Sequence, residues 1–132
     1  MEPYLIKFPT NGSSSIGYLS IIENSINLPF TLERVFWTFH TPDSIVRGRH
    51  AHYTTEMVLI ALSGRIIVNT EMPINLKREI YILENPNEGL YIPKQCWHTM
   101  QYSHNSVQLV IASTKYDETD YIRDYSVFQK IK

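Results

Sequence analysis

The stretch that decides the fold of this chain reads Arg47-Gly48-Arg49-His50-Ala51-His52-Tyr53-Thr54-Thr55-Glu56. Because side chains alternate between the two faces of a β-strand, His50, His52 and Glu56 are predicted to point the same way. A third imidazole can reach the same place from a second stretch, Gly89-Leu90-Tyr91-Ile92-Pro93-Lys94-Gln95-Cys96-Trp97-His98. Such a cluster is typical of a metal site or of an acid–base site.

Around this stretch, short runs of β-branched and aromatic residues alternate with Gly, Pro and Asn turn signals. This pattern predicts an all-β sandwich or barrel. Ser63-Gly64 is predicted to turn the chain so that 65–69 forms a hairpin with 54–62. Acidic residues over 116–120 precede 121–131, which we expect to form one or two helical turns. The other expected strands are 18–22, 32–39, 79–83, 90–92 and 107–113.

The size and charge of the chain exclude several classes of protein. The 132 residues, 43% of them hydrophobic, suit one domain over 1–132 with a real core. A net charge of −1 gives no basic surface for nucleic acid or an anionic membrane. The longest apolar run, 57–62, is too short to span a bilayer. A single cysteine, Cys96, and an N-terminus without a signal-peptide pattern favour a reducing, cytoplasmic compartment.

The two stretches together resemble the two sequence motifs of the cupin superfamily. In metal-binding cupins, the positions that match His50, His52, Glu56 and His98 hold one ion. Three imidazoles and a carboxylate suit iron, manganese, zinc, copper or nickel. Glu56 equally suits a buried hydrogen-bond anchor, because it lies just before an apolar run. The resemblance implies a cupin jelly-roll barrel, here with a short C-terminal helical turn.

A longer set of motifs gives a more specific resemblance. The motifs are Arg47-Gly48-x-His50-Ala51-His52, Gly89-Leu90-Tyr91-Ile92-Pro93 with Trp97 after it, Leu109-Val110-Ile111-Ala112-Ser113 and Tyr116-Asp117-Glu118-Thr119-Asp120-Tyr121-Ile122-Arg123-Asp124-Tyr125. They are similar to the sugar 3,4-ketoisomerase branch of the cupins, which acts on dTDP-4-keto-6-deoxyglucose. The resemblance implies that neither a metal nor a cofactor is needed. It also implies a homodimer with strands exchanged between subunits.

The resemblance assigns roles to the histidine pair: His50 matches the family's base, and His52 matches the residue that assists proton transfer at the sugar oxygens. The reaction moves a carbonyl from C4 to C3 through an enediol, and the electrons stay within the substrate. Histidine suits this task, because its ordinary pKa of about 6.5 lets it take and return a proton near neutrality. The product would feed an aminotransferase in dTDP-3-amino-3,6-dideoxysugar biosynthesis.

The nucleotide sugar itself suggests binding residues. Arg47 is the best candidate for the diphosphate, because a guanidinium forms paired hydrogen bonds with phosphate oxygens. Arg34 and Arg49 are weaker candidates. Aromatic side chains such as Trp97 or Tyr91 can pack against sugar or thymine, or equally belong to the core.

The chain departs from many relatives at Phe36-Trp37, where they often carry two tyrosines. The phenolic proton donor is therefore absent at this place, and Tyr18, Tyr102 or His98 are the candidates to replace it. Tyr102 and His98 are accordingly also predicted to bind the substrate. The C4 configuration of the product stays open between gluco and galacto. Two other functions also remain open: a metal-dependent, dioxygenase-like cupin and a non-catalytic sugar-nucleotide binding module.

Overall fold

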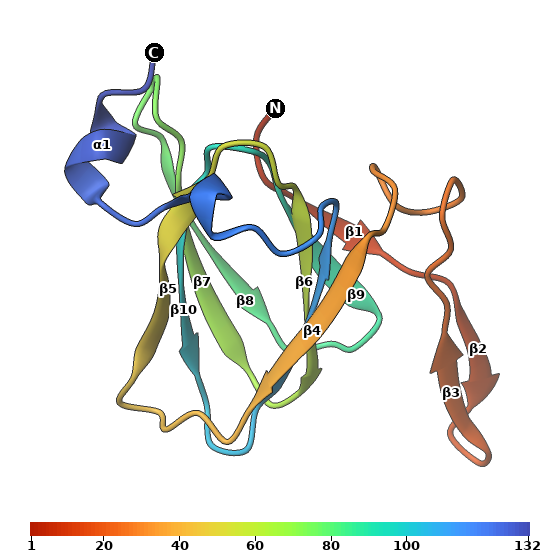
Figure 1. Cartoon of the computed structure of the whole chain (residues 1–132). Helices are drawn as coiled ribbons and strands as arrows, with labels where there is room; N and C mark the ends of the chain where they lie inside the picture. Colours follow the sequence, from red (N-terminus) through yellow and green to blue (C-terminus); the bar gives the residue numbers. More distant parts are fainter.

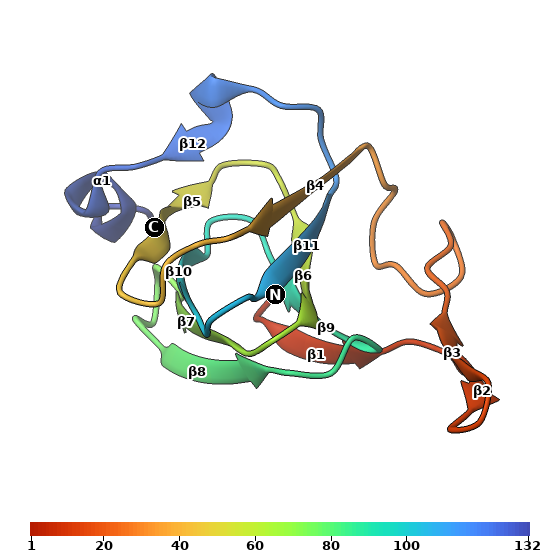
Figure 2. The same ribbon diagram turned by 90° about the horizontal axis from the view of Figure 1, so that it is seen from below.

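The computed structural model describes residues 1–132, and two five-stranded antiparallel sheets form its body (Figure 1). The view from below shows the strands enclosing a common interior (Figure 2). This arrangement confirms the expected all-β jelly-roll barrel. The first sheet has the order β1 (Tyr4–Lys7), β9 (Glu88–Ile92), β6 (Met57–Ser63), β11 (Val107–Ala112), β4 (Arg34–Phe39). The second has the order β12 (Tyr121–Ile122), β5 (Val46–His52), β10 (Trp97–Tyr102), β7 (Ile66–Glu71), β8 (Arg78–Leu83).

Apolar side chains from both sheets fill much of the interior. Leu59 and Val110 of the first sheet belong to the same buried cluster as Val68 and Leu83 of the second. Removing such a side chain from water contributes roughly 1.5–3 kcal/mol. Strand alternation selects these residues: in β4, Arg34, Phe36 and Thr38 are partly buried, whereas the residues between them are exposed.

The predicted hairpin between 54–62 and 65–69 is wrong. β6 pairs with β11 and β9, whereas β7 pairs with β10 and β8. The chain crosses from one sheet to the other at Gly64, which has a φ of 76°. A turn signal predicts a change of direction, but it does not say which strand becomes the neighbour.

A separate two-stranded hairpin, β2 (Thr10–Ser13) and β3 (Gly17–Ser20), stands away from the barrel (Figure 1). Its strands pair only with each other, and all four residues of β3 are exposed. A two-stranded ribbon has little stability of its own in water. The hairpin therefore exposes backbone and apolar side chains that the barrel does not cover.

The C-terminal segment is only partly helical. A single turn of 3₁₀-helix, Glu118–Asp120, leads into β12, and the α-helix α1 covers Tyr125–Gln129. The expectation of a helix is therefore confirmed for 125–129 but wrong for Tyr121–Ile122, which pair with His52 and Ala51 of β5. The α1 cap is Asp124, whose carboxylate accepts from the Ser126 amide at 2.8 Å. The structure contains no helix with the length and apolar character needed to cross a membrane.

Candidate active site

A cavity of about 190 Å³ lies inside the barrel and receives side chains from both sheets. His50 and His52 come from β5, and His98 comes from the neighbouring strand β10. The structure therefore brings together the three predicted histidines. Other lining residues are Phe36, Thr38, Arg47, Gly48, Met57, Leu59, Met100, Tyr102, Gln108, Val110, Tyr121 and Arg123.

A β-bulge in β5 decides which side chains enter this cavity. His50 lies opposite His98 and Gly48 lies opposite Thr99, so Arg49 has no partner residue on β10. The bulge reverses the alternation, and Arg47 therefore lines the same cavity as His50. Gly48 has a φ of 86°, and a Cβ there would lie 2.8 Å from the carbonyl oxygen of His98. Only glycine fits, because that conformation and that contact both exclude a side chain.

The three imidazoles lie close to one another. The ring centres of His50 and His98 are 4.9 Å apart, those of His50 and His52 are 5.1 Å apart, and those of His52 and His98 are 6.0 Å apart. His98 Nδ1 lies 3.0 Å from the carbonyl oxygen of Cys96, so in the neutral ring this nitrogen donates and Nε2 is free to accept. His98 Nε2, His52 Nε2 and His50 Nδ1 are buried without a hydrogen-bond partner.

The surroundings keep these imidazoles neutral. Burial is the main cause that lowers the pKa of His50 to about 2, and repulsion from His98, His52 and Arg123 adds to it. Burial, followed by repulsion from His98, lowers the pKa of His52 to about 3. Burial lowers the pKa of His98 to about 4. Neutral rings have free lone pairs and can accept protons, as an acid–base site requires.

A C-terminal strap, residues 116–123, covers the histidine pair. The ring centre of Tyr121 lies 5.1 Å from that of His50 and 4.4 Å from that of His52. The Arg123 guanidinium lies 4.3 Å from the centre of the Tyr121 ring, and its Nε donates to Glu118 at 2.7 Å. Sequence reasoning did not select Tyr121 or Arg123 as site residues. Both residues belong to the Tyr116–Tyr125 motif, so the sequence did contain a signal that could have found them. Only the pairing of β12 with β5 shows that this motif lies against the histidine pair.

Asp120 fixes the strap to the loop between β5 and β6. Its carboxylate accepts from the backbone amides of Thr54 and Thr55, at 2.9 and 3.1 Å, and from both threonine hydroxyls. Hydrogen bonds to the charged form keep the pKa of Asp120 below its ordinary value, against the opposing effect of burial.

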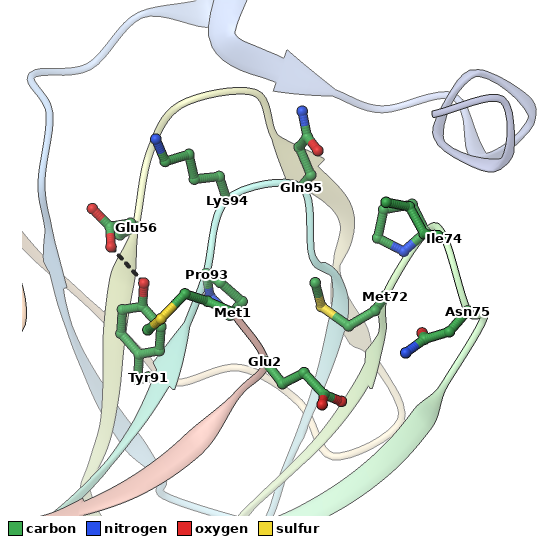
Figure 3. A pocket seen from close by; sticks show the side chains of 11 residues that line it. Met1, Glu2, Glu56, Met72, Ile74, Asn75, Tyr91, Pro93, Lys94 and Gln95 are labelled. Carbon is green, nitrogen blue, oxygen red and sulfur yellow. Dashed lines mark hydrogen bonds between the residues drawn. The ribbon is translucent and has the colours of Figure 1, made fainter. Parts of the chain in front are cut away.

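Glu56 does not join the histidines, so the prediction that it points the same way is wrong. β5 ends at His52 and β6 begins at Met57, which leaves Glu56 in the connecting loop. Its carboxylate accepts from the Tyr91 hydroxyl in a different hollow of about 530 Å³, which Figure 3 shows together with Lys94. Within the structure, no group of three or more His, Cys, Asp and Glu side chains is arranged to hold a metal ion. The four-ligand set of the alternative, metal-binding cupin is therefore not assembled.

The remaining predicted binding residues lie at different distances from the cavity. Tyr102 lines it. Arg34 lies at the strap, with its guanidinium 5.6 Å from the centre of the Tyr116 ring. Trp97 does not line the cavity: it packs outside β10 against Tyr125 and Phe128, at 5.1 and 5.5 Å between ring centres. Strand alternation explains this position, because Trp97 precedes the inward-facing His98.

Two further candidates lie elsewhere. Arg49, the bulged residue, is exposed, and Tyr18 belongs to the projecting hairpin, where 68% of it is exposed. Tyr91 is buried in the second hollow. Of the three candidates to replace the absent phenolic donor, the histidine cavity therefore contains Tyr102 and His98.

A comparison with known protein families covers the whole chain. The FdtA family model, described as WxcM-like, C-terminal, matches residues 1–132. The chain belongs to the FdtA family.

Relatives that match most of the chain are named as sugar 3,4-ketoisomerases, which confirms the resemblance seen in the motifs. One, the TDP-4-oxo-6-deoxy-alpha-D-glucose-3,4-oxoisomerase of Aneurinibacillus thermoaerophilus, is 43% identical over 119 residues, which are 88% of this chain and 83% of that protein. A histidine-to-asparagine variant of the 3,4-ketoisomerase QdtA from Thermoanaerobacterium thermosaccharolyticum, in complex with TDP-4-keto-6-deoxyglucose, is 36% identical with a TM-score of 0.91. That match covers 97% of this chain and 91% of QdtA. A 3,4-ketoisomerase from Helicobacter canadensis is 33% identical, with a TM-score of 0.91 and coverage of 98% and 96%.

The geometry of this FdtA-family chain agrees with isomerase chemistry. Two neutral imidazoles from one strand and a third from its neighbour surround a cavity with room for about six water molecules by liquid volume. That volume is comparable to one monosaccharide ring. The enzyme class predicted from the sequence, an isomerase, is the class of its relatives.

Proposed function

We propose that this FdtA-family enzyme converts TDP-4-keto-6-deoxyglucose to a TDP-3-keto-6-deoxyhexose. The observation that carries the proposal is the cluster of three neutral imidazoles, each with a buried ring nitrogen that has no hydrogen-bond partner, in a cavity of sugar size. Such nitrogens are costly to bury unless a ligand uses them. A single domain over 1–132 carries the activity.

In this mechanism His50 is the base. It removes the proton at C3, which the ketone at C4 acidifies, and the electron pair forms the enediol. A proton then returns at C4, while His52 moves a proton between O3 and O4, so the carbonyl ends at C3. The negative charge that develops on the substrate stabilises the imidazolium of His50, and it offsets both the cost of burying that charge and the repulsion from Arg123. General acid–base catalysis of this kind contributes on the order of 10²–10⁴-fold.

Arginines would hold the nucleotide. Arg47 lines the cavity and is exposed, and its exposure leaves the guanidinium free to bind phosphate oxygens. Arg34 is the second candidate, because its Nε is buried without a partner beside the strap. Arg123 is less available, because Glu118 accepts from two of its nitrogens, at 2.7 and 3.0 Å.

The test is incubation with TDP-4-keto-6-deoxyglucose in heavy water, followed by NMR. We expect a 3-keto product with solvent deuterium at C4. Binding without rearrangement would instead identify a non-catalytic binding module. Elemental analysis addresses the metal-dependent cupin: a stoichiometric ion whose removal abolishes turnover would contradict the proposed mechanism.

The proposal includes a homodimer that exchanges N-terminal strands. The projecting β2–β3 hairpin supports it, because Ile16, Tyr18 and Leu19 are 83%, 68% and 57% exposed. Trp37 on the outer face of β4 is 60% exposed as well. We expect Leu19→Asp to shift the protein towards monomer in light scattering, whereas the matched change Ile74→Asp, on an exposed loop residue, leaves its mass unchanged.

The remaining parts of the proposal concern the setting of the reaction. A cytoplasmic location is supported by Cys96, which is a free and buried thiol. The 3-keto product has the carbonyl that an aminotransferase needs, so we place the enzyme before such a step in the synthesis of 3-amino-3,6-dideoxysugars.

A further inference from the structure

A second polar group lies in the cavity, away from the histidines. The antiparallel register places Gln108 of β11 beside Thr38 of β4 on one side and Ala61 of β6 on the other. β11 begins directly after the turn that follows β10, at the end of the barrel opposite to the one where β5 meets β12 (Figures 1 and 2). Gln108 is the second residue of β11, whereas His52 is the last residue of β5. The cavity therefore has polar groups towards both ends.

The amide oxygen of Gln108 has its hydrogen-bond partners within the protein. Its Oε1 accepts from the hydroxyl of Tyr102, which is 2% exposed, and from Thr38 Oγ1 at 3.4 Å. These two hydroxyls hold the amide in one orientation. Tyr102 therefore supports Gln108, and its proton is committed to that amide.

The other end of the amide has no partner. Gln108 is 0% exposed, and its Nε2 is buried without a hydrogen bond. Buried donors without partners are rare in folded proteins, because the lost hydration is not replaced. The neighbouring lining residues Leu59 and Val110 are apolar, so a side chain that served only packing here would be apolar as well.

We propose that Gln108 is a further substrate-binding residue, which donates from Nε2 to an oxygen of the hexose. This inference rests on the proposed function, since it requires the sugar of the nucleotide sugar to occupy the cavity. A ring placed between the histidines and Gln108 has hydroxyl or ketone oxygens on its periphery, and each can accept this hydrogen bond. The contact fixes the ring relative to His50 and leaves the nucleotide untouched.

The test compares Gln108→Met with the wild type. Methionine is of similar length and has no donor. We expect kcat/KM for TDP-4-keto-6-deoxyglucose to fall roughly 10- to 100-fold, because a hydrogen bond is lost and a sugar oxygen is left unpaired. Affinity for TDP alone, measured by calorimetry, should stay within twofold. The melting temperature should fall only modestly, because the substitution removes the unpaired Nε2 donor but also the acceptor of the Tyr102 and Thr38 hydroxyls.

Thr38→Val is the matched control, because it removes a partner of Oε1 and leaves Nε2 in place. It should change kcat/KM less than Gln108→Met does. If Gln108→Met fails to fold, Gln108→Asn carries the same expectation, because it keeps an amide but withdraws the donor by one methylene group.

Two results would overturn the inference: unchanged kcat/KM in the folded variant, or an equal loss of affinity for TDP alone. A wild type that binds the sugar nucleotide without converting it would refute the proposed function only. The difference in sugar-nucleotide affinity between wild type and variant would then still decide the role of Gln108. A wild type that does not bind the sugar nucleotide would refute both.

Discussion

The two hollows of this protein differ in whether their buried polar groups have hydrogen-bond partners, and the larger hollow is the one whose buried groups are paired. The hollow at Glu56 is about 530 Å³, whereas the histidine cavity is about 190 Å³. In the larger hollow, the Glu56 carboxylate is paired with the Tyr91 hydroxyl (Figure 3). In the smaller cavity, His50, His52, His98 and Gln108 each have a buried polar atom without a partner. Unsatisfied hydrogen-bonding groups identify the site, because they gain most from a ligand.

The largest expected effect is a loss of turnover when the histidine cavity is changed but not when the hollow at Glu56 is changed. His50→Asn removes the proposed base, and kcat should fall on the order of 10²–10⁴-fold while the fold is retained. Glu56→Gln is the control and should keep kcat within about threefold, because a neutral amide still accepts from Tyr91. The measurement is turnover of TDP-4-keto-6-deoxyglucose, with circular dichroism to check folding. Equal losses in both variants would show that the two hollows act as one site.

The second prediction concerns acid stability. The unfolded chain binds a proton on each histidine below a pH of about 6.5, whereas burial keeps folded His98 neutral to a pH of about 4. The free energy of unfolding should therefore have its full value above pH 6.5. Between pH 6.5 and 4 we expect the free energy of unfolding to fall by about 1.4 kcal/mol per pH unit through His98.

His52 should make the free energy of unfolding fall with pH by a similar amount per unit, because burial lowers its pKa to about 3. Urea unfolding at several pH values measures this dependence. His98→Gln should reduce the slope, whereas His104→Gln, at an exposed turn, should leave it unchanged. An equal slope in all three proteins would show that the cavity does not keep His98 neutral.

The third prediction tests whether the strap positions the histidines. Tyr121→Leu removes the ring that lies against His50 and His52, and we expect kcat to fall roughly 10-fold with little change in KM. The pH–rate profile should shift as well, because Arg123 loses the ring on which it packs. Tyr53→Leu, at an exposed tyrosine, is the control. A change confined to melting temperature would assign the strap a structural role only.

The smallest effect is expected in the larger hollow. Tyr91→Phe leaves the Glu56 carboxylate without its hydroxyl partner, and we expect a loss of about 1–2 kcal/mol of stability with kcat/KM unchanged. Tyr4→Phe is the control, because Tyr4 is 40% exposed and packs on the Tyr91 ring at 4.9 Å. A loss of turnover in Tyr91→Phe would contradict the distinction between the hollows.

The sequence by itself determined the chemistry and most of the strands. Alternation within β5 and the motif around His98 were enough to predict three converging imidazoles, since these patterns depend on residues close in the chain. The same motifs predicted the family, which the match over 1–132 confirms.

Only the tertiary structure decided which other side chains meet the histidines. The bulge at Arg49 turns Arg47 inward, the end of β5 sends Glu56 to another hollow, and β12 brings Tyr121 from the far end of the chain. Gln108 meets Thr38 across a separation of 70 residues. Strand partners and bulges depend on contacts distant in sequence, whereas periodicity reports only which face a side chain shares with its near neighbours.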